Sequence, residues 1–316
     1  MSYDVVTMGR VGVDLYPNQH GVPLADVETF SKFLGGTATN VAVACARYGH
    51  NAAVITKVGD DGFGPFVRKA LTRFGVDTRF VGTDPELRTP VVFCEIHPPD
   101  HFPILFYRQP KAPDLNLHRH ELDLDAIAAA RILWTTGTGL CAEPSRTATL
   151  AALDTRVGGD GLATIHDLDY RAVFWDSAEE AGRWQREALA RATITVGNLE
   201  ECAVAVGEGS PETMAARILD LGVEVAVVKQ GPKGVSAHTA AGTFAAAPVS
   251  VEVVNGLGAG DAFGGAVCHG LLSGWAWPDT IAFANAAGAY VAGQLACADA
   301  MPDEATVRSM MVSGRG

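Results

Sequence analysis

The chain has 316 residues, of which 48% are hydrophobic and 19% are charged, proportions that are usual for a globular protein and that exclude a disordered or fibrous one. Its formal net charge of −12 argues against a nucleic-acid partner, because binding to a phosphate backbone requires a basic surface. A site for an anionic ligand must therefore be basic locally, through a few Arg or Lys side chains and backbone N–H groups.

Cysteine spacing and hydropathy bear on where the protein works. The six cysteines lie far apart and form no Cys-x-x-Cys pair or zinc-type Cys/His spacing, so we expect buried free thiols. The first residues contain no basic segment followed by an apolar one, and no stretch of ~20 apolar residues occurs later. We therefore expect a cytoplasmic protein without a membrane partner.

Short runs rich in β-branched residues alternate along the chain with helical stretches rich in Ala and Leu. The predicted strands are Asp4–Met8, Ala52–Val58, Arg131–Thr135, Ala163–His166, Thr193–Val196, Val225–Val228 and Val249–Val254. The predicted helices are Thr39–Tyr48, Pro65–Phe74, Ser145–Arg156, Ala178–Arg191, Met214–Leu221, Ala262–Leu272 and Pro278–Leu295. This alternation predicts an α/β fold with a parallel sheet and helices on both of its faces.

Two segments, at about 10–34 and 88–112, interrupt this pattern. They are rich in Pro, aromatic residues and extended-chain formers, and the second has too many prolines for a central strand. We expect them to form a small β lid over the carboxyl ends of the parallel strands, where open α/β sheets place ligands. An ordinary surface excursion is the alternative. Residues 1–316 are then one domain with a lid.

Candidate ligand-binding residues follow the first strand and precede the first helix. Arg10 and Asp14 lie just beyond the strand, where a carboxylate can accept hydrogen bonds from the paired hydroxyls of a sugar. The sequence GGTATN, which contains Gly35, Gly36 and Asn40, joins the lid segment to the helix. It can present backbone and amide groups to a polyol, or serve only as a helix N-cap.

Three later motifs also follow predicted strands. In DLDYR, Arg171 can pair with phosphates, with an ion pair to a neighbouring Asp as the alternative. In GNLEE, Asn198 and Glu201 lie on one helix face and suit water-mediated Mg²⁺ binding, with a capping pair as the alternative. The tight turn KQGPKG, which contains Lys229, Gly231 and Gly234, is suited to a position against a nucleotide.

The strongest pattern is VNGLGAGDAFGGAVCHG. Its glycines allow close approach of the backbone, and the N–H groups of the helix that follows form an anion hole around Gly258, Ala259 and Gly260. Asp261 in the first helical turn can orient and deprotonate a hydroxyl for phosphoryl transfer. The alternative is that Asp261 only complements the helix dipole, an effect worth roughly 0.3–1 kcal/mol.

The order of these motifs, GGxxxN, DxDxR, NxxE, KxGxxG and GAGD, resembles the ribokinase-like (PfkB) carbohydrate kinase family over nearly the whole chain. The resemblance implies a ribokinase-like three-layer α/β/α sandwich with a small β-sheet lid, ATP along the later motifs, and sugar under the lid. It implies that Asp261 is the catalytic base, that the residues before it form the anion hole, and that Asn198 and Glu201 serve Mg²⁺ and phosphate. It further implies sugar-binding roles for Asp14, Gly36 and Asn40. We also expect Gly35 and Arg171 to bind the substrate and a homodimer to form through the lid. The residues expected to bind the nucleotide are Asn198, Glu201, Lys229, Gly231, Gly234 and Asn285.

Denser matches, among them GVDLYPNQ, FPILFYR and FANAAGA, resemble a subgroup of the family that acts in inositol catabolism. They imply transfer of the γ-phosphate of ATP to the terminal (C6) hydroxyl of 5-dehydro-2-deoxy-D-gluconate, a keto-deoxy sugar acid. A carboxylate substrate suits Arg10, Lys57 or Arg108, which lie at strand ends or in the lid, and ordinary surface exposure is the alternative for each.

One departure and three alternatives remain. Asn255, Gly256 and Leu257 stand where many family members have Asp-Thr-Thr, which puts a monovalent-cation site in doubt. Another sugar kinase, acting on 2-keto-3-deoxygluconate, fructose or ribose, fits the same motifs. A dinucleotide oxidoreductase is disfavoured because the opening GRVGVD lacks Gly-x-Gly-x-x-Gly. A catalytically inactive nucleotide sensor is disfavoured because Asp261 and its glycines are present.

Overall fold

The computed structural model describes residues 2–156, 158 and 163–313. In this part of the chain a nine-stranded sheet has the order β13-β12-β11-β10-β9-β8-β1-β4-β5. Its strands are β1 (Val5–Met8), β4 (Ala52–Gly59), β5 (Val81–Asp84), β8 (Ile132–Thr136), β9 (Ala163–Asp167), β10 (Ile194–Asn198), β11 (Val225–Lys229), β12 (Val235–Thr239) and β13 (Gly242–Ala246). Neighbours from β5 to β11 pair in parallel, and the two edge pairs β11–β12 and β12–β13 are antiparallel.

The parallel strands are apolar on both sides because helices cover both faces of the sheet. Side chains alternate across a strand, so Val5 packs in the cluster that contains Phe263, whereas Val6 packs in the cluster that contains Ala148. One face carries α1 (Thr37–Arg47), α2 (Phe63–Arg73), α8 (Ala259–Leu272), α9 (Trp277–Ala292) and α10 (Glu304–Ser313). The other carries α3 (Leu124–Ala129), α4 (Ser145–Asp154), α5 (Ala178–Leu189), α6 (Leu199–Val206) and α7 (Pro211–Leu219).

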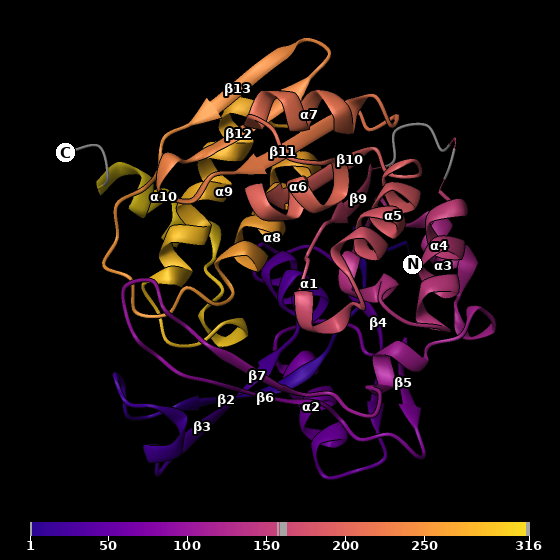
Figure 1. The fold of residues 1–316 in the computed structure, drawn as a ribbon, viewed down its shortest axis with the longest axis vertical. Helices are drawn as coiled ribbons and strands as arrows, with labels where there is room; N and C mark the ends of the chain where they lie inside the picture. Colours follow the sequence, from indigo (N-terminus) through magenta and orange to yellow (C-terminus); the bar gives the residue numbers. More distant parts are fainter. Residues whose placement is uncertain (1, 157, 159–162, 314–316) are drawn as a thin grey trace.

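A separate four-stranded sheet has the order β3-β2-β6-β7. It consists of β2 (Gly12–Pro17), β3 (Phe30–Gly35), β6 (Val91–Cys94) and β7 (Ile104–Tyr107), which belong to the two Pro- and aromatic-rich segments. Figure 1 shows these strands together at one end of the molecule, opposite the β12–β13 hairpin. The predicted three-layer α/β/α fold with a small additional β sheet is therefore confirmed, and we call this small sheet the lid.

The structure corrects two predicted elements. The predicted strand Val249–Val254 is wrong: this segment lies outside the strands, and its end is held by a hydrogen bond from Val254 N to Ala292 O. The predicted helix Pro278–Leu295 is too long, since α9 ends at Ala292 and is followed by Gly293. None of the helices among the described residues has both the length and the apolar character that a membrane span requires.

Candidate active site

A cavity of about 460 Å³ lies between the lid and the carboxyl ends of the parallel strands. Because these strands run in parallel, the residues that end β9, β10 and β11 meet at one edge of the sheet, as the fold class requires. Twelve of the predicted site residues line the cavity: Arg10, Asp14, Gly36, Asn40, Arg171, Asn198, Glu201, Lys229, Gly231, Gly258, Gly260 and Asp261.

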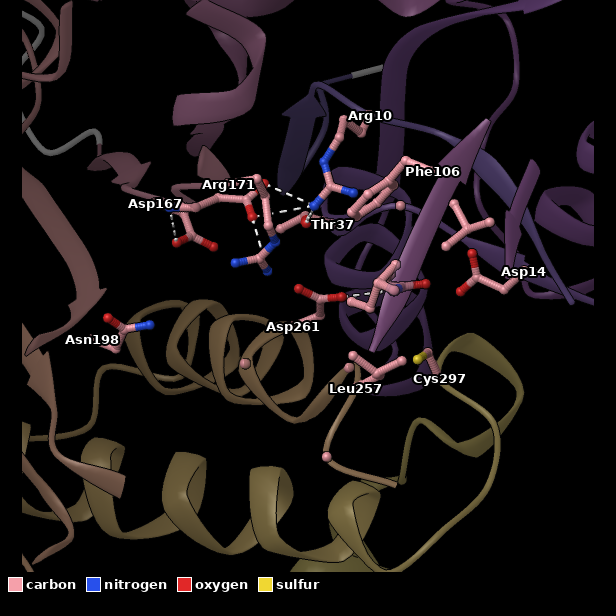
Figure 2. Close-up of a pocket in the computed structure, with 18 of the residues that line it drawn as sticks. Arg10, Asp14, Thr37, Phe106, Asp167, Arg171, Asn198, Leu257, Asp261 and Cys297 are labelled. Carbon is pink, nitrogen blue, oxygen red and sulfur yellow. Dashed lines mark hydrogen bonds and ion pairs between the residues drawn. The ribbon is translucent and has the colours of Figure 1, made fainter. Parts of the chain in front are cut away.

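Asp261 lies in the middle of this cavity. Figure 2 shows its carboxylate between Asn198 and Asp167 on one side and Asp14 and Cys297 on the other. One carboxylate oxygen, Oδ2, accepts a hydrogen bond of 2.7 Å from Asn40 Nδ2. Burial raises the pKa of Asp261 to about 6, against the effect of this hydrogen bond. The group is therefore ionised at neutral pH but basic enough to accept a proton, as a general base requires.

The backbone before Asp261 forms the start of α8. Gly258 is the N-cap and adopts a left-handed conformation with φ of 82°, and a Cβ there would lie 2.7 Å from Cys297. The first N–H groups of a helix have no partner within it, so those of Ala259, Gly260 and Asp261 are free of intrahelical bonds. This turn provides the backbone donors of an anion site.

Lys229, at the end of β11, brings a positive charge to the same turn. A Cβ on Gly260 would lie 3.3 Å from Lys229 Nζ, so a glycine leaves room for the ammonium group. Burial alone would lower the pKa of Lys229, but the carboxylates of Glu201 and Asp167 outweigh burial and raise it. Lys229 is therefore positively charged at neutral pH, and it lies beside the backbone donors at the start of α8, where it could offset the charge of a bound phosphate.

A hydrogen-bond network fixes two arginines at the other side of the cavity. Asp169, which is buried, accepts hydrogen bonds from Arg10 Nη2 at 3.0 Å and from Thr138 at 2.8 Å, and it pairs with Arg171 at 3.2 Å. Arg10 also donates to Thr37 and, through Nε, to Thr138. Within the described part of the chain its Nη1 has no hydrogen-bond partner. Arg10 therefore has a fixed orientation and one free donor group at the cavity.

The charges of this network are set by its ion pairs. Burial alone would raise the pKa of Asp169, but Arg10 and Arg171 lower it well below its usual range. Asp167 is buried beside Asp169, from whose backbone N–H it accepts a hydrogen bond, and among the described residues it forms no ion pair with either arginine; desolvation raises its pKa. Arg171 thus forms an ion pair with Asp169, which was the alternative that the sequence left open. Its side chain nevertheless lines the cavity.

Asn198 and Glu201 form a reciprocal cap at the start of α6. Asn198 Oδ1 accepts a hydrogen bond from Glu201 N at 2.9 Å, and Glu201 Oε2 accepts one from Asn198 N at 2.7 Å. The capping alternative is therefore observed, although both side chains also line the cavity. Over the residues that the structure describes, no three His, Cys, Asp or Glu side chains form a metal-binding cluster.

The structure does not bring Lys57 and Arg108 to this cavity. Lys57 Nζ pairs with Glu121 at 2.7 Å and also donates to the carbonyl oxygen of Asn116. Arg108 makes a two-armed ion pair with Asp114 and lines a neighbouring cavity beyond Phe106. Each buried cation pairs with a carboxylate because a desolvated charge requires a partner. The sequence had not indicated either pair.

Gly35, Gly234, Ala259 and Asn285 lie next to the cavity without lining it. Gly35 contacts the back of Asp14: a Cβ there would overlap the Asp14 carboxylate. The other three line an apolar pocket of about 600 Å³ together with Val251 and Phe263. This pocket shares Lys229, Gly231 and Gly260 with the cavity, so the two spaces meet at the N-terminus of α8.

Sequence reasoning missed several lining residues, notably Tyr16, Phe106, Asp167 and Cys297. The position of Asp167 at a predicted strand end, and that of Tyr16 two residues after Asp14 on a strand, would have indicated them. Cys297 carried no local signal, since it reaches the cavity through the turn after α9.

Comparison with known proteins identifies relatives over nearly the whole chain. The family model described as pfkB family carbohydrate kinase matches residues 2–304. A 5-dehydro-2-deoxygluconokinase from Clostridium beijerinckii is 33% identical over 315 residues, which cover 98% of this chain and 92% of that protein.

Solved structures share the fold. A putative ribokinase II from E. coli, at 23% identity, superposes with a TM-score of 0.90 over 99% of this chain and 100% of that one. Fructokinase from Vibrio cholerae O395, solved with fructose, ADP and calcium ion, is 26% identical with a TM-score of 0.86, and the match covers 98% of this chain and 100% of that one.

Proposed function

The chain belongs to the pfkB family of carbohydrate kinases, and on this premise we propose that it transfers the γ-phosphate of ATP to the terminal (C6) hydroxyl of 5-dehydro-2-deoxy-D-gluconate. The observation that carries the proposal is the position of Asp261, a carboxylate of raised pKa beside the backbone anion site of α8. The name of the Clostridium beijerinckii relative supports this substrate.

The reaction follows from the two groups at the start of α8. Asp261 accepts the proton of the substrate hydroxyl as its oxygen forms a bond to the γ-phosphorus, and the bond from that phosphorus to the β,γ-bridging oxygen breaks to release ADP. The backbone N–H groups after Gly258 and the ammonium group of Lys229 stabilise the charge that develops on the transferred group. Asn40 holds the carboxylate of Asp261 in place.

The two joined cavities suit the two substrates. The apolar pocket beside α9 suits an adenine ring, and Asn285 at its edge, which donates to Ala247 O, would line the nucleotide side. The phosphates then point to the α8 turn that the pocket shares with the cavity. The V. cholerae fructokinase, solved with fructose and ADP, supports one sugar site and one nucleotide site in this fold.

Mg²⁺ suits the nucleotide side of the cavity. The carboxylate of Glu201 and the amide of Asn198 line this side, and their mutual capping bonds leave outside the cap Glu201 Oε1, which lies 3.7 Å from Arg171 Nη1. Since Mg²⁺ keeps several of its waters and needs few protein ligands, these two residues would hold a hydrated ion without a carboxylate cluster. When bound, Mg²⁺ neutralises charge on the β- and γ-phosphates.

A sugar acid requires a cation at the end of the cavity away from the phosphates. Arg10 meets this need, because its guanidinium is held by Asp169 and Thr138 and keeps Nη1 free. Asp14 and Asn40 then contact the sugar hydroxyls. We therefore assign the substrate carboxylate to Arg10 rather than to Lys57 or Arg108, which are occupied by their own ion pairs.

Two further expectations belong to the proposal. An enzyme that consumes ATP and a catabolic sugar acid is expected in the cytoplasm. A homodimer through the lid is supported by Leu105 and Tyr107 on the edge strand β7, whose side chains are 45% and 61% exposed. Sedimentation of the wild type and of Tyr107→Lys tests the dimer, since a charge within the proposed interface should dissociate it.

A substrate panel tests the activity. ADP formation is measured with 5-dehydro-2-deoxygluconate, 2-keto-3-deoxygluconate, fructose and ribose, at saturating ATP and Mg²⁺. We expect kcat/KM to be highest for the first acid. Faster turnover of another sugar would change the substrate assignment but leave the assignment as a sugar kinase intact. ADP formation with none of the sugars would contradict the proposed function.

A further inference from the structure

Tyr16 is buried at the sugar end of the cavity, where the proposed reaction gives it no role. It lies on β2, two residues after Asp14, so both side chains project from the same face of the strand. Its side chain is 1% exposed, and its ring packs against Phe33 with the ring centres 5.4 Å apart. Its hydroxyl oxygen lies 2.8 Å from Asp14 Oδ2 and 2.8 Å from Cys297 Sγ.

The direction of these two hydrogen bonds follows from the groups involved. An ionised carboxylate can only accept, so the Tyr16 hydroxyl donates to Asp14. Its single proton is then used, so the contact with Cys297 is made by the thiol S–H donating to the Tyr16 oxygen. Burial, together with the neighbouring Asp14, raises the pKa of Tyr16 well above its usual value, so the hydroxyl stays a donor.

Asp14 needs such a donor because its surroundings disfavour its charge. Burial raises the pKa of Asp14 to about 6, and the hydrogen bond from Tyr16 and the charge of Arg10 act in the opposite direction. The carboxylate is packed directly against Gly35, where a Cβ would overlap it. The buried thiols of Cys94 and Cys297 also lie near this carboxylate, and burial together with its charge raises the pKa of both.

We propose that Tyr16 is a positioning residue that keeps the carboxylate of Asp14 ionised and directed at the substrate hydroxyls, and that Cys297 fixes the Tyr16 hydroxyl. Because Cys297 also fills the space that a side chain at Gly258 would need, this chain of contacts joins the sugar end of the cavity to the turn that begins α8. Figure 2 shows Asp14 and Cys297 at this same end of the cavity. The inference rests on the proposed function, in which Asp14 binds the sugar.

Tyr16→Phe tests this role, because it removes the hydroxyl and keeps the ring against Phe33. We expect KM for the sugar acid to rise about tenfold, in line with the weakening of a hydrogen bond to a charged group. KM for ATP and kcat should change by less than about twofold. The acid-side rise in KM for the sugar should begin at a higher pH than in the wild type, which a purely structural role for Tyr16 would not produce.

Tyr107→Phe is the matched control, because it removes the hydroxyl of an exposed tyrosine of the same sheet and should leave both KM values unchanged. Cys297→Ala should raise KM for the sugar by a smaller factor than Tyr16→Phe does. Cys297→Ser, which keeps a hydrogen-bond donor, should have a sugar KM close to that of the wild type.

The result that overturns the inference is a Tyr16→Phe enzyme with the wild-type sugar KM and pH profile. If Tyr16→Phe does not fold, the Cys297 pair decides: a sugar KM that is raised in Cys297→Ala and restored in Cys297→Ser supports the role, and equal values in both contradict it. These outcomes are separate from failure of the proposed function, in which the wild type itself would phosphorylate none of the sugars.

Discussion

Replacing Asp261 by Asn separates the catalytic interpretation of this residue from the helix-dipole one. The amide has the size of the carboxylate and can still accept a hydrogen bond from Asn40, so the geometry of the cavity is kept. It cannot accept the proton of the substrate hydroxyl. Loss of a general base typically lowers the rate ~10²–10⁴-fold, and we expect this loss in kcat, with KM for ATP nearly unchanged because the backbone donors of α8 remain.

The same substitution should stabilise the folded protein. The pKa of Asp261 is raised from 3.8 to about 6 on folding, so the folded state binds more protons than the unfolded state between these values and stability falls as pH rises through this range. Above pH 6 the ionised carboxylate costs up to about 3 kcal/mol, from ~1.4 kcal/mol per pKa unit. Asn removes this cost, and for a chain of 316 residues we expect Tm at pH 7.5 to rise by about 2–5 °C.

Asp279→Asn is the matched control. Asp279 is also the third residue of a helix, α9, but it is exposed to solvent. Its replacement should leave kcat unchanged and lower stability by the dipole contribution of ~0.3–1 kcal/mol. Steady-state kinetics and thermal unfolding at pH 7.5 measure both quantities. If Asp261→Asn behaved like Asp279→Asn, with wild-type kcat and a slightly lower Tm, the general-base mechanism would be refuted.

Three further predictions use the same assays. Arg10→Met should raise KM for the sugar acid about ten- to hundredfold, through loss of a charge-assisted hydrogen bond, whereas Lys57→Met should lower Tm and leave this KM unchanged; equal KM values in both variants would place the carboxylate elsewhere. The pH profile of kcat/KM should fall below about pH 6, as Asp261 and Asp14 become protonated; a profile that is flat down to pH 5 would contradict this. Activity should change less than about twofold when K⁺ replaces a large organic cation at fixed ionic strength, because Asn255 offers no carboxylate and its amide is bonded to Leu295 O and Leu257 N; a steep rise with K⁺ would disprove it.

Local patterns predicted the elements of the fold well where each element carries its own signal. The β-branched runs identified β1, β4 and β8 to β11, because buried parallel strands are apolar on both sides. The same reasoning failed for Val249–Val254, whose alternating valines face the apolar pocket instead of a sheet. The β12–β13 hairpin was missed because both strands are short and β13 is mostly exposed, so its hydrophobic pattern is weak.

The sequence predicted those site residues that belong to a motif at the end of a strand or the start of a helix. Asp261, Lys229 and Asn198 follow from motifs at element ends, where the parallel topology gathers them. Lys57 and Glu121 are 64 residues apart, so no local pattern reveals their ion pair. Arg108 and Asp114 are only six residues apart, but no regular helix or strand spacing indicates that they pair. For the same reason the sequence alone could not select, from three basic candidates, Arg10, to which we propose to assign the substrate carboxylate.

The cavity joins residues from nearly the whole length of the chain, from Arg10 to Cys297. Ligand binding therefore depends on contacts between segments that are far apart in sequence, which form late and slowly compared with local helices. A ligand held at this place should protect the entire molecule against unfolding rather than one part of it. At a concentration of 100 Kd a single ligand adds ~2.7 kcal/mol, so hydrogen exchange should slow together in β1, α8 and the lid when nucleotide and sugar are bound.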